Sequence, residues 1–237
     1  LRFNISAGES KRYAEIHGVP ESYFYTVCQN IRDAVEIKQR NNLEVTIGLQ
    51  MVLMPQYQDQ IIPLAKLGKE LNVDYLVIKH CSDDEKGSLG VQYSEYESLY
   101  EILKRAEMFS TDTYYVRAKW SKLKDGNKRR YTQCYGAPFM LQLSGSGLVA
   151  PCGMLFGENY KKYWIGNIVE TSFKKIWQSD RYWDVMNEIA STNFDARVMC
   201  GTLCLQHNVN EFLWDLKKLK IELHDPIAPP PRHINFI

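Results

Sequence analysis

The sequence predicts an α/β fold in its first half, followed by a small cysteine-rich α+β module. Two observations support this prediction. Apolar residues recur alternately at the period of a strand and at the period of a helix between Leu1 and Ser121, and the pattern changes at Cys134, where paired cysteines begin. The segments between successive strands are long enough to hold helices, which parallel strands require as crossovers. A parallel sheet is therefore expected, and both a doubly wound sheet and a partial barrel satisfy the pattern.

The first half is expected to open directly on a strand, because Leu1, Phe3 and Ile5 alternate with polar residues. The strictest alternation follows between Leu43 and Leu53, and Pro55 ends it. In chain order we expect a polar loop at 8–18, a helix at 24–35, strands at 43–53 and 74–80 with a helix at 61–68 between them, a helix at 94–103 that begins with a capping box of Ser94 and Glu97, and a strand at 114–121.

The second half predicts a β-hairpin followed by helices. Residues 139–143 and 148–150 flank a Ser-Gly-Ser-Gly turn at 144–147. Helices are expected at 173–177, 180–189 and 209–216 from apolar residues at helical spacing. Cys134 precedes the hairpin and Cys152 follows it, so these two thiols can come close together. The proline-containing segment 223–237 is expected to be extended.

Composition restricts the classes of function. The chain has 237 residues, of which 45% are hydrophobic and 24% charged, and its net charge is +1. A general nucleic-acid binder or a membrane-surface protein normally carries a strong basic excess, so we expect neither partner. No apolar run approaches the length of about 20 residues that a spanning helix needs. We therefore expect a cytoplasmic protein with reduced thiols, in which paired cysteines are metal ligands more often than disulfides.

Four cysteines of the second half are the candidate metal ligands. Cys134 and Cys152 are separated by seventeen residues, and Cys200 and Cys204 by three. Four thiolates can hold a zinc ion or a [4Fe–4S] cluster, and the number of ligands does not distinguish the two. The alternative is four separately buried thiols. Cys28, on the apolar face of its helix, is expected to be a core residue.

A second group of candidates lies at the carboxyl ends of the expected parallel strands, where functional residues of α/β proteins collect. Asn4 and Ser6 follow the first strand, Gln50 lies near the end of the next, and Lys79 near the end of the third. His80 and Cys81 are expected to be packed residues rather than ligands. The basic segment 117–131 could steer an anionic substrate, but a solvated surface hairpin is the simpler interpretation.

The residues of both halves resemble one protein family. The run 165–179, with Gly166-Asn167-Ile168 and Ile176-Trp177, lies between Cys152 and Cys200 and resembles the SPASM or shortened "twitch" module of radical S-adenosylmethionine enzymes. Upstream, residues 1–8, 13–18 and 27–31 are similar to the fourth strand and following helix of the partial (β/α)6 barrel of these enzymes. Residues 45–53 and 75–79 would be strands five and six.

The resemblance implies three regions: a partial barrel at 1–130, a SPASM or twitch iron–sulfur module at 131–222 and an extended tail at 223–237. Cys134, Cys152, Cys200 and Cys204 would ligate an auxiliary [4Fe–4S] cluster, although the family usually has Cys-x2-Cys where this chain has Cys-x3-Cys. Asn4 and Ser6 match a strand-four position that contacts S-adenosylmethionine, and we add Gln50 and Lys79 to the expected cofactor-binding set.

The catalytic Cys-x3-Cys-x2-Cys motif of the family does not occur before Cys134. We therefore interpret the chain as the C-terminal part of a radical enzyme that modifies a peptide or a small metabolite, and we expect the fragment itself to be inactive. An exposed barrel flank would then favour a homodimer. The alternative function is a non-catalytic binding or structural module held together by zinc.

Overall fold

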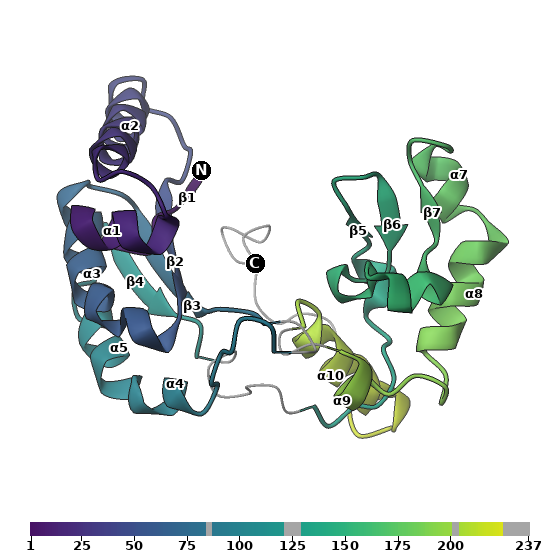
Figure 1. The fold of residues 1–237 in the computed structure, drawn as a ribbon. Helices are drawn as coiled ribbons and strands as arrows, with labels where there is room; N and C mark the ends of the chain where they lie inside the picture. The colour runs from purple at the N-terminus through teal and green to yellow at the C-terminus, as the bar shows by residue number, and fades with distance from the viewer. Residues whose placement is uncertain (84–86, 121–128, 201–203, 225–237) are drawn as a thin grey trace. The chain divides into compact units, whose positions relative to one another are not determined.

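The computed structural model describes residues 1–83, 87–120, 129–200 and 204–224. The described residues form two compact units, of which the first ends before the gap at 121–128 and the second begins at Arg129 (Figure 1). Most of the expected tail at 223–237 and most of the expected basic hairpin at 117–131 lie outside the described residues. The two units are described separately below.

The first unit contains a four-stranded parallel sheet. Its strands are β1 (Arg2–Asn4), β2 (Gly48–Leu53), β3 (Tyr75–His80) and β4 (Tyr115–Ala118), and their order in the sheet is the order in the chain. The crossovers contain α1 (Ser10–His17), α2 (Ser22–Arg40), η1 (Pro55–Gln60), α3 (Ile61–Glu70), α4 (Glu95–Ser98) and α5 (Tyr100–Glu107). The predicted α/β fold with a parallel sheet is confirmed.

The two faces of this sheet differ in character. Alternate residues of β2 and β3, among them Leu49, Met51 and Ile78, are fully buried and pack with apolar residues of the helices, and α1, α3 and α5 lie along this side (Figure 1). Successive side chains of a strand point to opposite faces, so Gln50 and Lys79 belong to the other face, where they are only half-buried. The helix-covered face thus supplies the core and the other face carries polar groups.

Residues 10–17 form helix α1, so the prediction of a polar loop at 8–18 is wrong for this segment. The helix buries a single side chain, Tyr13, which packs on Phe24 with a distance of 5.6 Å between ring centroids. Gly18 ends the helix in a left-handed conformation with φ of 65°. One buried residue in eight gives too weak an apolar period for the sequence to reveal the helix.

Two further expectations need correction. Strand β2 begins at Gly48 rather than at residue 43, because its partners Arg2 and Tyr75 begin there, and Leu43 remains 46% exposed. The expected helix at 94–103 is divided at Leu99 into α4 and α5. Ser94 has helical backbone angles and makes no side-chain capping hydrogen bond, so the capping box is absent there.

The second unit is built around a small antiparallel sheet. Strands β5 (Gln142–Leu143) and β6 (Leu148–Ala150) form the predicted hairpin, and β7 (Gly166–Asn167) pairs with β6. The helices are α7 (Phe173–Trp177), α8 (Asp180–Ile189), α9 (Ala196–Met199) and α10 (His207–Lys217), with 3-10 turns η2 (Ala137–Phe139), η3 (Gly153–Leu155) and η4 (Glu158–Tyr163). Within the described part of the chain, no helix combines the length and apolar character needed to cross a bilayer.

The core of the second unit is aromatic and aliphatic. Tyr163, Tyr182 and Phe194 are each at most 2% exposed, and the Tyr163 and Phe194 rings meet edge to face at 5.7 Å. Cys134, Cys152 and Cys200 pack against this core as half-buried residues. Three of the candidate ligands are therefore held by the same packing that holds the unit together.

Candidate functional site

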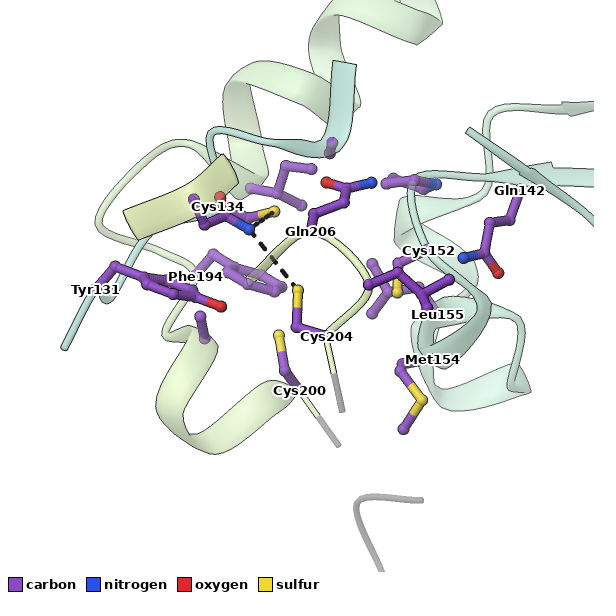
Figure 2. A pocket seen from close by; sticks show the side chains of 16 residues that line it. Tyr131, Cys134, Gln142, Cys152, Met154, Leu155, Phe194, Cys200, Cys204 and Gln206 are labelled. Carbon is purple, nitrogen blue, oxygen red and sulfur yellow. Dashed lines mark hydrogen bonds between the residues drawn. The ribbon is translucent and has the colours of Figure 1, made fainter. Parts of the chain in front are cut away.

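The four candidate cysteines of the second unit line a single cavity. Cys134 lies just before η2, Cys152 just before η3, Cys200 directly after α9 and Cys204 just before α10. Figure 2 shows their side chains around this cavity. The remaining lining residues are mostly apolar: Tyr131, Ala137, Gln142, Pro151, Met154, Leu155, Ile189, Phe194, Ala196, Leu205, Gln206 and Asn210. The structure thus brings together all four cysteines that the sequence selected.

Cys134 and Cys152 occupy equivalent positions at the start of a turn. Burial raises the pKa of both thiols, and the backbone N–H groups of Ala137 and Gly136 partly offset this increase at Cys134, as those of Met154 and Gly153 do at Cys152. Such N–H groups favour the negative charge of a thiolate. The two turns therefore partly oppose the effect of burial.

Cys134 and Cys204 share one hydrogen-bond donor. The side-chain nitrogen of Asn210 lies 3.6 Å from the Cys134 sulfur and 3.9 Å from the Cys204 sulfur. The two sulfurs are therefore no farther apart than the sum of these distances, 7.5 Å. Cys134 is also tied to the end of α8, because its N–H donates to the carbonyl oxygen of Ile189 at 2.9 Å.

Burial dominates the protonation of these thiols. It raises the pKa of Cys134 to about 11. It also raises the pKa values of Cys152 and Cys200, and the Arg129 guanidinium partly offsets both increases. Neighbouring cysteines add to the increase, because several thiolates close together repel one another. Without a cation, these three thiols are protonated at neutral pH.

The donor set suits an iron–sulfur cluster. It combines four soft sulfur atoms, apolar walls and an amide nitrogen close to two of the sulfurs, which are protein features that suit such clusters. As the side chains are placed, no three His, Cys, Asp or Glu side chains within the described residues are grouped as ligands of a metal ion.

Tyr131 lines the cavity, and its hydroxyl also contacts His207. The Tyr131 hydroxyl lies 3.2 Å from Nδ1 of His207, and burial raises the Tyr131 pKa. His207 in turn lies 3.7 Å from a carboxylate oxygen of Glu211, one helical turn later.

The second group of candidates is gathered on the polar face of the parallel sheet in the first unit. Asn4 on β1 is the register partner of Gln50 on β2, and Lys79 on β3 is the register partner of Val52 on β2. The side chains of Asn4, Gln50 and Lys79 therefore lie on the same face of the sheet. Ser6 has φ of 49°, and its hydroxyl accepts a hydrogen bond from the Val52 N–H and donates to the Asn4 side-chain oxygen.

His80 and Cys81 are packed residues. His80 is 1% exposed, and its ring contacts those of Tyr93 and Tyr96 at centroid distances of 5.6 and 5.4 Å. The Cys81 N–H donates to the Tyr96 hydroxyl. These contacts agree with the interpretation of both residues as structural.

Sequence reasoning missed two residues that the structure places at these sites. Arg117 on β4 is the register partner of Val77 and therefore shares the polar face with Gln50 and Lys79. Strand register, which the sequence does not contain, was needed to place it. Asn210 is the other, and no sequence signal distinguishes it from Asn208 on the same helix.

Comparison with known proteins gives two findings. Residues 134–204 match the family model of SPASM, an iron–sulfur cluster-binding domain, and this range starts at Cys134 and ends at Cys204. Among solved structures, the chain is similar to Streptococcus suis SuiB bound to S-adenosylmethionine, with a TM-score of 0.53, 15% identity and coverage of 84% of this chain and 48% of SuiB.

The chain is also similar to Streptococcus suis SuiB bound to its precursor peptide SuiA, with a TM-score of 0.52, 14% identity and coverage of 84% of this chain and 47% of SuiB. It therefore spans about half the length of these relatives. No curated protein matches the chain. The match supports the expected SPASM module at residues 134–204, and the likeness to SuiB supports the fold expected for the chain.

Proposed function

We propose that the chain belongs to a radical S-adenosylmethionine enzyme that modifies a peptide, and that Cys134, Cys152, Cys200 and Cys204 hold an auxiliary [4Fe–4S] cluster. The observation that carries this proposal is the convergence of all four cysteines on one apolar cavity inside the SPASM domain. The cluster would supply electron-transfer or substrate-binding chemistry. The chain's own contribution is to bury the ligands, exclude water and place the Asn210 amide nitrogen beside two of the sulfurs.

The first unit supports the same proposal. Its parallel strands follow the order of the chain, as in a (β/α) barrel, whereas a doubly wound sheet reverses its order at a switch point. We infer a partial barrel over residues 1–130 whose polar face binds S-adenosylmethionine through Asn4, Ser6, Gln50 and Lys79. The likeness to SuiB bound to S-adenosylmethionine supports this ligand, and the likeness to SuiB bound to its precursor peptide supports a peptide as substrate.

The cluster is tested by anaerobic reconstitution with iron and sulfide, followed by metal and sulfide analysis. Wild type should bind about four iron and four sulfide per chain, with the absorption and EPR spectra of a [4Fe–4S] cluster. Serine substitution of Cys134 or Cys152 should lower the iron content sharply. Cys28→Ser is the matched control, because Cys28 is a 2% exposed thiol in the core of the first unit. Retention of zinc alone by wild type would contradict the proposal and favour the structural zinc module.

The cofactor face is tested by the affinity for S-adenosylmethionine, measured by calorimetry on the reconstituted protein. Asn4→Leu or Lys79→Met should weaken binding about tenfold, the effect of losing one charge-assisted hydrogen bond. Lys66→Met is a suitable control, because Lys66 is an exposed lysine on helix α3. Unchanged affinity in both face variants would contradict the assignment of this face, without bearing on the cysteine site.

A further inference from the structure

We propose that Asn210 is a positioning residue for the auxiliary cluster: its side-chain amide fixes Cys134 and Cys204 relative to one another and raises the reduction potential of a cluster bound to them. The inference rests on the proposed iron–sulfur site. It concerns a residue outside the range 134–204 that the SPASM model matches.

The orientation of the Asn210 amide is determined by its surroundings. Asn210 is 0% exposed, and its side-chain oxygen accepts hydrogen bonds from the backbone N–H groups of Tyr135 and Gly136, both at 2.8 Å. A backbone N–H can only donate, so the amide oxygen must face these two groups. The NH2 group must then face the opposite side, where the sulfurs of Cys134 and Cys204 lie at 3.6 and 3.9 Å.

The number of donors matches the number of acceptors. The amide nitrogen carries two hydrogens, and two sulfurs lie within its reach. Cys134 and Cys204 are 70 positions apart in the sequence and belong to different segments, so one side chain connects the hairpin side of the cavity to the start of α10. The buried Asn210 side chain thus contacts two backbone N–H groups through its oxygen and two sulfurs through its nitrogen.

The backbone at Gly136 allows this approach. A Cβ atom at residue 136 would lie 3.3 Å from Cγ of Asn210 and 2.8 Å from the side-chain oxygen of Gln206. The glycine therefore lets the segment after Cys134 come close enough to α10 for the amide to reach both of its backbone partners.

Helix α10 is also anchored independently of the cysteines. The Arg130 guanidinium donates to both carboxylate oxygens of Asp215, at 2.6 and 2.5 Å, and to Glu211 at 2.8 Å. Glu211 is the neighbour of Asn210 in the sequence. A two-pronged contact of this kind fixes direction as well as distance, so the helix presents the amide to the cavity in a defined position.

Hydrogen bonds to ligand sulfurs affect the two redox states of a cluster unequally. The reduced cluster carries one more negative charge, so an N–H group directed at a ligand sulfur stabilises it more than the oxidised form and raises the reduction potential. Removing both hydrogen bonds of Asn210 should therefore lower the potential.

The experiment compares the reconstituted wild-type protein with Asn210→Leu and Asn210→Asp in an EPR-monitored redox titration. Leucine has a similar shape and no hydrogen bonds, whereas aspartate keeps an oxygen for Tyr135 and Gly136 and lacks the NH2 group. Both variants should shift the reduction equilibrium about tenfold toward the oxidised cluster, which is about 59 mV for one electron. Asn193→Leu is the control, because Asn193 is an exposed asparagine of the same unit. An unchanged potential in both Asn210 variants, with the cluster retained, would overturn the inference.

A second measurement uses only the wild-type protein, in case the variants do not fold or do not retain the cluster. With asparagine labelled by nitrogen-15 in the side chain, pulsed EPR of the reduced cluster should show a coupling to the amide nitrogen. The absence of such a coupling would count against the contact. If wild type takes up no iron at all, the proposed function fails, whereas a loaded cluster with no coupling and no shift in potential refutes the role of Asn210 alone.

Discussion

The pH dependence of metal uptake should reveal the buried thiols of the second unit. Burial raises the pKa of Cys134 from 9.0 to about 11, and it raises the pKa values of Cys152 and Cys200 as well. One pKa unit corresponds to 1.36 kcal/mol, so the shift at Cys134 penalises its thiolate by about 2.7 kcal/mol, a factor of about one hundred. A metal ion binds thiolates, so each of these thiols must release a proton on binding.

The direction in which metal affinity changes with pH follows from the raised pKa values. Below these values the empty site holds its protons, so protons compete with the metal, and the affinity must increase as the pH increases. With at least three protons released, the affinity should increase about a thousandfold per pH unit between about pH 6 and pH 8. Near the raised pKa of Cys134 the dependence should become less steep.

Cobalt(II) is a suitable probe, because sulfur-to-cobalt charge transfer gives a direct optical signal and no sulfide is needed. Titrations of the metal-free protein at several pH values, under argon and with a competing chelator, give the slope of log affinity against pH. Cys152→Ser should lower this slope by about one, since it removes one released proton, and Cys28→Ser should leave it unchanged. A slope of one or less in wild type would show that the thiols are already ionised, and it would contradict the conclusion that burial raises their pKa values.

Two further predictions concern stability, and amide hydrogen exchange by mass spectrometry measures them in each unit separately. A Cβ atom on Gly8 would lie 2.4 Å from the backbone nitrogen of Leu64, so Gly8→Ala should destabilise the first unit by about 3 kcal/mol and accelerate exchange in β2. Gly157→Ala should have little effect on exchange, because its Cβ atom would meet Tyr160 at an ordinary contact distance of 3.7 Å. Equal exchange in the two variants would contradict the steric argument. The Ser179 hydroxyl accepts a hydrogen bond from the Tyr182 N–H at the start of α8. Ser179→Ala should therefore lower the stability of this helix end by about 1 kcal/mol and speed amide exchange in its first turn about fivefold. Unchanged protection in that turn would exclude a capping role for Ser179.

The parallel sheet could be predicted from the sequence because its central strands are buried on one face and alternate clearly. Leu49, Met51 and Leu53 are fully buried, and the half-buried residues between them belong to the other face. Helix α1 could not be predicted, since Tyr13 is its single buried residue and its end depends on the conformation of Gly18. The true start of β2 was also hidden, because Leu43 and Val45 continue the alternation although no strand lies beside them.

The residues of the candidate site also differ in whether the sequence reveals them. The cysteines could be found because thiols at paired spacing are rare, and the chemistry of four of them restricts the alternatives strongly. Asn210 could not be found in the same way, because asparagine is a common residue and its function depends on distances to two sulfurs that are 70 positions apart in the chain. Ligands are thus recognisable from sequence, whereas the groups that orient the ligands require the fold.

Two opposing effects act on the protonation of the thiols at this site. Burial favours the neutral thiol, so the second unit can form its core around Cys134, Cys152 and Cys200 at neutral pH without burying several negative charges. The N–H groups of the two turns and of Asn210 favour the thiolate, and they are already in place before any cation arrives. A bound cation removes the desolvation and repulsion that oppose ionisation, and the N–H groups then act without opposition.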